Sequence, residues 1–191
     1  RKRFHWKQEK PHSNYLISLV AGELSRVDLG KAGGVPITLY SRPGTEDQVR
    51  NAFGTTGECM EFFTDYIGVP YPWEKYAQVA VPEFIFGGME NTSATTQTDK
   101  VLYPDRMRDW GWRRAEQLMA HELAHQWFGD AVTTKDWAHI WMNEGFATYF
   151  DALFTEHKHG RSDFISDMLD NQRVYFAGES EESRPILHGE Y

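Results

Sequence analysis

The sequence predicts an α+β fold, because strand-like runs come first along the chain and long helical patterns follow them. In the first half, short apolar runs lie between glycine- and proline-rich turns, as strands do. In the second half, apolar residues recur at the steps of three, four and seven that define one face of a helix. A length of 191 residues with 40% hydrophobic residues suffices for one core, or for one domain and the edge of another.

Five segments are expected to be extended or turn-like. The run over residues 14–29 alternates apolar and polar side chains at its start, and the run over residues 35–40 lies between glycine and proline-glycine turns. Residues 76–81 form a third apolar run. The threonine-rich residues 92–98 could form an edge strand beside a cleft, and residues 131–134 a short strand or turn.

The helices are predicted from their apolar faces and from their ends. Thr45 and Asn143 are residue types that cap helix N-termini, and Gly129 is the type that ends helices. We expect helices over residues 46–67, 109–128, 143–158 and 162–176.

Composition excludes several classes of function. The net charge of −8 argues against a nucleic-acid partner, which would need a basic surface, and no apolar run is long enough to cross a bilayer. The single cysteine, Cys59, excludes an internal disulfide and is expected to be a small buried hydrophobic residue. The chain begins with Arg1 and shows no signal-peptide core, so we expect a piece of a longer protein. The compartment stays open.

The segment His121-Glu122-Leu123-Ala124-His125 indicates a zinc site. A spacing of four residues in a helix puts both imidazoles on one face, close enough to share one Zn²⁺ ion. Glu122 lies one position round the helix, where its carboxylate can reach a water at the metal without binding the metal itself. We therefore expect Glu122 to be the general base of a hydrolase. Taken alone, the pattern also fits two hydrogen-bonded core histidines.

Glu144 is the expected third ligand, because a catalytic zinc ion needs a third protein ligand and an open position for water. Eighteen residues separate it from His125, and it opens the next long helix. Asp151 follows seven residues later on the same helix face. From there it can accept a hydrogen bond from the free ring nitrogen of a ligating histidine and fix the tautomer of that ring. A solvated aspartate is the ordinary alternative for this position.

Three blocks together resemble the zinc aminopeptidases of the aminopeptidase N type, a gluzincin family. They are HELAHQWFGD from His121 to Asp130, WMNEGFA from Trp141 to Ala147, and Gly87-Gly88-Met89-Glu90-Asn91, which is similar to the exopeptidase signature of the family. The likeness covers nearly the whole chain. It implies a thermolysin-like catalytic domain with a small, mostly antiparallel sheet over residues 30–191, lacking its C-terminal part. It also implies that residues 1–29 are the end of an N-terminal β-domain.

The resemblance also implies how substrate binds. Glu90 would bind the free α-amine of a peptide, and Gly87, Gly88, Met89 and Asn91 would line the substrate's path, with the two glycines allowing close approach of its backbone. Gly88 stands where the family more often has Ala, and a residue from the N-terminal β-domain would complete the amine site. The family's transition-state tyrosine would lie beyond this chain, so no such role is assigned to Tyr149, Tyr175 or Tyr191.

The expected reaction is hydrolytic release of the N-terminal residue from peptides, with the missing domains of the parent chain as further partners. Two alternatives stay open. A gluzincin endopeptidase would cleave N-acetylated peptides as well, although the Glu90 block argues against it. A non-catalytic protein-binding module would be free to lose its ligands, yet His121, Glu122, His125 and Glu144 are all present.

Overall fold

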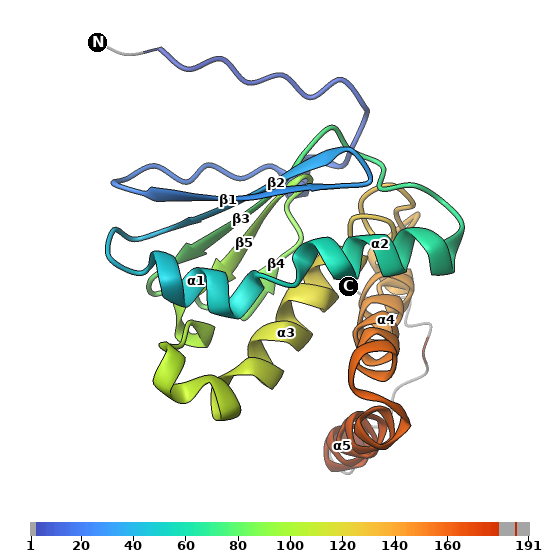
Figure 1. Ribbon diagram of the computed structural model, residues 1–191. Helices are drawn as coiled ribbons and strands as arrows, with labels where there is room; N and C mark the ends of the chain where they lie inside the picture. The colour runs from blue at the N-terminus through green and yellow to red at the C-terminus, as the bar shows by residue number, and fades with distance from the viewer. Residues whose placement is uncertain (1–2, 180–185, 187–191) are drawn as a thin grey trace.

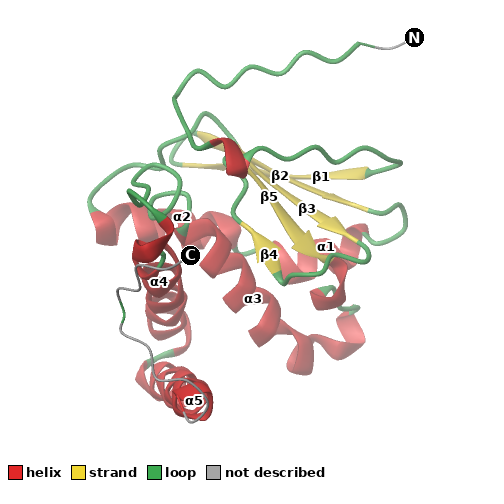
Figure 2. Ribbon diagram, turned by 180° about the vertical axis from the view of Figure 1, so that it is seen from behind, coloured by secondary structure: helices red, strands yellow, loops and turns green. Residues whose placement is uncertain are grey.

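The computed structural model, which describes residues 3–179 and residue 186, has a five-stranded sheet with helices packed on one side (Figure 1). The extended N-terminal segment runs along the other side of the sheet (Figure 2). The α+β prediction is therefore confirmed. The strands are β1 (Ser25–Ala32), β2 (Val35–Ser41), β3 (Tyr76–Val81), β4 (Gly88–Met89) and β5 (Ala94–Thr98).

The sheet is mixed, whereas a mostly antiparallel sheet was expected. Its strand order is β1-β2-β3-β5-β4. The outer pairs β1–β2 and β5–β4 are antiparallel, and β3 is parallel to both of its neighbours. The parallel pairing arises because the chain crosses over between β2 and β3 through helices. Strand β4 is thus at an edge, and β5, which was expected there, lies inside the sheet.

Of the run expected as a strand over residues 14–29, only the part from Ser25 forms one. Residues Asn14–Leu16 form a single 3-10 turn, and the first strand begins at Ser25. The side chains of Ile17 and Leu19 are 68% and 86% exposed. Alternation yields a stable strand only where a neighbouring strand can pair with it, and no described residue pairs with residues 14–24 in the sheet.

Strand β1 crosses residue 29, where the N-terminal part of the chain was expected to end. It pairs with β2 from one end to the other, so the residues on both sides of that boundary belong to one sheet. The division into residues 1–29 and 30–191 stays a prediction, and the end of the second range lies outside the described residues.

The helix expected over residues 46–67 is two helices, α1 (Glu46–Phe53) and α2 (Thr56–Ile67). The hydroxyl of Thr56 donates to the carbonyl of Phe53 at 2.6 Å, and so occupies an acceptor that a continuous helix would use for a backbone amide. The glycine between the two helices weakens helical structure further. Because the apolar periodicity continues across the break, the pattern does not reveal it.

The three remaining α-helices carry and surround the candidate site. They are α3 (Arg108–Ala124), α4 (Trp141–His159) and α5 (Arg161–Glu179). Helix α3 ends four residues before the expected position, because the next amides bond to the carbonyls of Leu123 and Ala124 in tighter turns. The segment expected as a short strand or turn makes one isolated bridge, between Phe128 and Val132.

Neither predicted N-cap side chain acts as a cap. Thr45 does precede α1, but its hydroxyl donates to the carbonyl of Arg42 at 2.7 Å. Asn143 lies inside the first turn of α4, where its amide N–H donates to the carbonyl of Ile140 at 2.9 Å. The side chain of Asn143 is buried instead, and it bonds to another part of the chain.

The main core lies between the helices and the sheet, and Cys59 is buried in it as expected. Polar groups also enter this core from β3 and β5. Gln78 donates to the hydroxyl of Thr56 at 2.6 Å and accepts from Gln97 at 2.5 Å, and all three side chains are fully buried.

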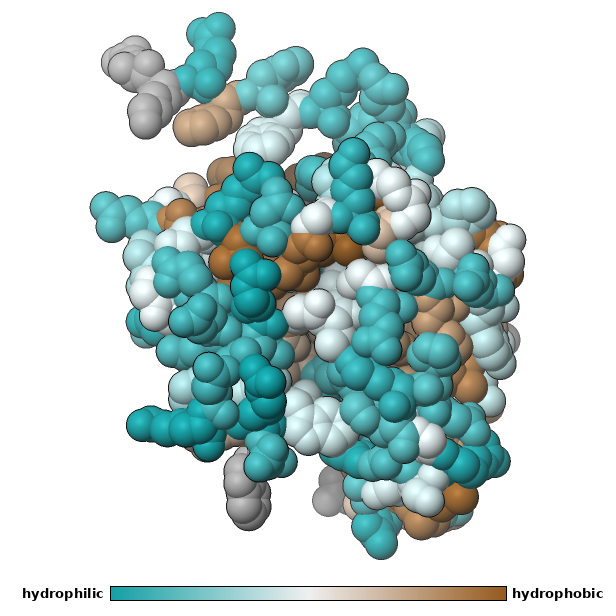
Figure 3. Space-filling view, in the orientation of Figure 1, coloured by the Kyte–Doolittle hydropathy of each residue, from teal (hydrophilic) through white to brown (hydrophobic). Residues whose placement is uncertain are grey.

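The face seen in Figure 3 is mostly hydrophilic, with apolar side chains gathered beneath the N-terminal segment. Among the described residues, no helix is both long and apolar enough to cross a membrane.

Candidate metal and catalytic site

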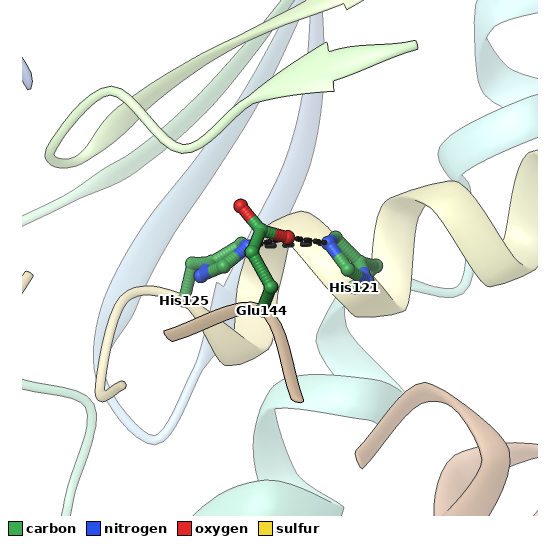
Figure 4. A group of neighbouring side chains, drawn as sticks. All are labelled: His121, His125 and Glu144. Carbon is green, nitrogen blue, oxygen red and sulfur yellow. Dashed lines mark hydrogen bonds and ion pairs between the residues drawn. The ribbon is translucent and has the colours of Figure 1, made fainter. Parts of the chain in front are cut away.

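Two helix ends bring the predicted metal ligands together. His121 lies in the last turn of α3, and His125 is the residue at which that helix ends. The pair is therefore at the C-terminal end of the helix and not in its middle. Glu144 lies in the first turn of α4, which packs against α3. Figure 4 shows the Glu144 carboxylate between the two imidazole rings.

The three ligand atoms lie at the spacing that a small cation requires. His121 Nε2 and His125 Nε2 are 3.1 Å apart, and Glu144 Oε2 lies 3.2 Å from the first and 3.5 Å from the second. Ligands bound about 2.0–2.1 Å from a tetrahedral zinc ion are separated from one another by roughly 3.3 Å. Two histidines and a carboxylate at this spacing fit zinc and leave a fourth position open.

The outer side of each ring fixes its tautomer. His125 Nδ1 lies 3.0 Å from the carbonyl oxygen of Phe128, and His121 Nδ1 lies 3.4 Å from Asp151 Oδ2. Carbonyl and carboxylate oxygens can only accept, so each Nδ1 carries the proton. In the neutral rings, two Nε2 lone pairs and a carboxylate oxygen then face one point. Such an arrangement is favourable only with a positive charge at that point.

In the absence of a metal ion, a proton on His121 supplies that charge. Burial by itself lowers the pKa of His121, but the hydrogen bonds to Asp151 and Glu144 outweigh burial and raise this pKa to about 10. Hydrogen bonds from both imidazoles lower the pKa of Glu144. The cluster therefore holds a positive charge, either a proton on His121 or a bound cation.

Zinc binding at pH 7 is expected to release about one proton, because the ring of His121 is protonated below a pKa of about 10 and must be neutral to bind. Calorimetric titrations in two buffers of different ionisation enthalpy measure this number. It should fall to about half near pH 10 and towards zero only above that pH. A binding enthalpy at pH 7 that is the same in both buffers would contradict this protonation state.

Asp151 lies two turns along α4 from Glu144, as the sequence predicts. Burial raises the pKa of Asp151 to about 6, and its hydrogen bond with His121 acts in the opposite direction. The side chain is therefore largely a carboxylate at pH 7. It can hold the His121 ring in the orientation that points Nε2 at the other ligands.

Asp151→Asn is expected to weaken zinc binding by roughly 10–100-fold, because the amide is a poorer partner for the His121 ring and leaves it less basic. Competition with a chromogenic chelator measures the dissociation constant. The matched control is Asp167→Asn, since the Asp167 side chain is 5% exposed against 14% for Asp151 but bonds to Arg113. Equal zinc affinity in the Asp151 variant and the unmodified protein would remove Asp151 from the site.

Glu122 lies beside the ligands and is only 5% exposed. Burial raises the pKa of Glu122 to about 7, although His121 and His125 act to lower it. A pKa near neutrality suits a group that must both take and return a proton. A β-carbon placed on Gly88 would overlap the Glu122 carboxylate, so the glycine in β4 leaves the space that this side chain occupies.

The segment that follows β4 brings Glu90 to the same place. Gly88 and Met89 form the edge strand, and Glu90 follows it with 7% of its surface exposed. One side-chain atom from each of Glu90, Glu122 and His125 lies within 4.8 Å of the other two. The predicted amine anchor, the predicted base and a predicted metal ligand are therefore neighbours.

Other members of this block make bonds within the protein. The Asn91 side chain donates to the carbonyl of Leu16 at 3.2 Å and accepts from the hydroxyl of Thr96 at 2.8 Å. The carbonyl of Gly87 accepts from the amide of Thr98 at 2.9 Å. These bonds hold the block against the sheet and the N-terminal segment, while its role in substrate binding stays a prediction.

Sequence reasoning assigns no role to several polar residues near the site. The Tyr15 hydroxyl accepts from Asn143 Nδ2 at 3.4 Å, and burial together with the charges of Glu90 and Asp130 raises the pKa of Tyr15 to about 12. Burial raises the pKa of Asp130 to about 9. Asp130 and Gln126 are polar residues among apolar neighbours in the sequence, and this pattern could have marked them as candidate site residues. Tyr15 gives none, because its segment has the pattern of a strand.

A cleft of about 390 Å³ opens beside His121, Glu122 and Asp151. Tyr149 and Tyr175, to which the sequence assigns no transition-state role, are not among the described residues that line it, and Tyr191 lies outside those described. Its lining includes Gly87, Gly88, Gln117, His121, Glu122 and Asp151.

The chain is similar to known peptidases. Residues 51–188 match the Peptidase family M1 domain. The chain is 35% identical to Aminopeptidase M1 of Arabidopsis thaliana, over 94% of this chain and 21% of the relative. It is 36% identical to Aminopeptidase 2 of Candida albicans (82% and 18%) and 33% identical to glutamyl aminopeptidase of Bos taurus (79% and 16%). The chain thus spans about a fifth of the length of these relatives, and it belongs to peptidase family M1.

Proposed function

We propose that this chain carries the catalytic centre of a zinc-dependent aminopeptidase, which releases the N-terminal residue from peptides with a free amine. The proposal is supported by the family and by relatives that are named aminopeptidases. The observation that carries it is the proximity of Glu90 to Glu122 and His125, within 4.8 Å. An amine held there would lie beside both the base and the metal ligands. His121, His125 and Glu144 would hold one Zn²⁺ ion.

Each residue then has one task. When bound, zinc supplies Lewis-acid polarisation of the scissile carbonyl and lowers the pKa of water. Glu122 takes a proton from the attacking water and returns it to the leaving amine. Glu90 pairs with the substrate ammonium, and so presents the first peptide bond to Glu122. The edge of β4 can pair with the substrate backbone.

The test combines metal analysis of the purified protein with turnover of aminoacyl 4-nitroanilides, with and without an N-acetyl group. We expect one zinc ion per chain and turnover of the free-amine substrates far above that of the N-acetylated ones. Equal turnover of N-acetylated peptides would favour an endopeptidase. A protein that binds no zinc and hydrolyses neither substrate would instead be a non-catalytic module.

A further inference from the structure

A buried glutamine joins the candidate amine anchor to the metal-binding end of α3. Gln126 directly follows His125 and is fully buried. Its side-chain Nε2 donates to the carbonyl of Glu90 at 3.0 Å, and its Oε1 accepts from the amide of Ser93 at 2.8 Å. We propose that Gln126 is a positioning residue that fixes the distance between the Glu90 carboxylate and the metal ligands. This inference rests on the proposed function.

The backbone that carries Glu90 needs such a support. Between β4 and β5 the chain turns sharply, with the amide of Ala94 donating to the carbonyl of Asn91 at 2.9 Å. Ser93 has a φ of 60°, a left-handed conformation that is costly for a residue other than glycine. One side-chain amide satisfies both the Glu90 carbonyl and the Ser93 amide, as a neighbouring peptide group would in a sheet. Without Gln126, two buried backbone groups would lack partners.

The glutamine itself is held in place. The Tyr71 hydroxyl shares its one proton between the carbonyl of Lys75 at 3.1 Å and Gln126 Oε1 at 3.3 Å, and Trp73 Nε1 donates to the Gln126 backbone carbonyl at 3.2 Å. Both aromatic side chains are buried. The side-chain amide therefore has a single orientation. Because one end of this link is bonded to the Glu90 backbone and the other is adjacent to His125, the backbone of Glu90 and the end of α3 cannot move independently.

A fixed separation matters for this chemistry. An aminopeptidase must hold the substrate amine at one point and the first peptide bond at another, so the distance between the points selects the bond that is cut. Displacing a reacting group by 1 Å can reduce a rate by about 10²-fold. A glutamine that only satisfied core groups would affect stability, whereas a positioning residue also affects the recognition of an amine relative to the metal.

The test compares Gln126→Met with the matched control Gln78→Met. Both changes keep side-chain length and remove a fully buried amide with hydrogen bonds, but Gln78 bonds to Thr56 and Gln97, away from Glu90. The probes are two inhibitors of anilide hydrolysis: butylamine, which requires an amine anchor, and acetohydroxamate, which binds zinc without an amine. Zinc content and the hydrogen exchange of the Ser93 amide are measured beside them.

In Gln126→Met we expect kcat/KM for the best aminoacyl anilide to fall about 10²-fold, and the inhibition constant of butylamine to rise at least tenfold. The inhibition constant of acetohydroxamate and the zinc content should stay unchanged, and the Ser93 amide should exchange faster. The Gln78→Met variant should keep both inhibition constants. If Gln126→Met fails to fold, Gln126→Asn, which retains an amide but is shorter by one methylene, should show the same separation of the two probes.

The inference is overturned if the Gln126 variants change both inhibition constants by the same factor, or change neither, while the unmodified protein still responds to both probes. If butylamine does not inhibit the unmodified protein but acetohydroxamate does, Glu90 is not an amine anchor. In that case the proposed function fails first, and the role of Gln126 fails with it.

Discussion

Replacing Glu122 by glutamine is expected to reduce turnover of aminoacyl anilides by about 10²–10⁴-fold while the zinc content stays at one ion per chain. The amide has nearly the shape of the carboxylate, so it fits the space beside Gly88. It cannot accept a proton from water, however, and the step that depends on a base is lost. The ligand atoms of His121, His125 and Glu144 are unaffected by the change.

Metal analysis and steady-state kinetics on the same preparation separate the two effects. The matched control is Glu116→Gln, because Glu116 lies on the same helix and is similarly buried, at 8% against 5% exposure for Glu122. Glu116 bonds to Lys158 and His159, so its loss should lower stability and leave turnover per folded molecule unchanged. Zinc loss in the Glu122 variant, or full turnover with zinc retained, would remove Glu122 from the role of base.

The pairing of His121 with His125 could be predicted from the sequence because its geometry is local. Residues four apart lie on one helix face whether the helix continues beyond them or ends at the second residue. The early end of α3 at His125 therefore did not disturb the predicted pairing with His121. The same reasoning places Glu144 and Asp151 two turns apart on α4, which is what brings both to His121.

Features that depend on distant partners could not be predicted in this way. Apolar alternation around Ile17 has the period of a strand, yet a strand also needs a neighbour, and the sequence does not say whether one is available. Strand β4 has only two residues, too few to show any period, although it is the edge that carries the Gly88–Glu90 segment. The parallel position of β3 is set by crossover connections and not by its own residues.

The role of Gln126 shows a further limit. Its bonds reach Glu90 and Ser93, which lie 36 and 33 residues earlier in the chain. Both partners are backbone groups, which every residue except proline offers in the same form. The sequence can show a polar residue at a buried position, but it cannot name the carbonyl or amide that this residue will meet.

Glu90→Gln is expected to lower kcat/KM for free-amine substrates by about 10²–10³-fold without loss of zinc. Glu90 is 7% exposed, so an ammonium paired with it is largely withdrawn from water and depends on its negative charge. Removing one partner of a buried charge pair costs about 2–5 kcal/mol, which is about 30- to 5,000-fold in rate, and the expected fall lies inside that range. The neutral amide keeps the size of the side chain, and the bond from Gln126 to the Glu90 carbonyl is unchanged.

The discriminating measurement is the ratio of kcat/KM for a free-amine anilide to that for its N-acetylated form. This ratio should collapse in Glu90→Gln, because an acetylated substrate has no charge for Glu90 to bind. In Glu122→Gln both rates should fall together, since every substrate requires the base. Glu83→Gln, an equal change of charge at an exposed residue before β4, controls for the overall field of the protein. A preserved ratio in Glu90→Gln would mean that another group recognises the amine. The next residues to replace would then be Tyr15 and Asp130, because the charge of Glu90 raises the pKa of both.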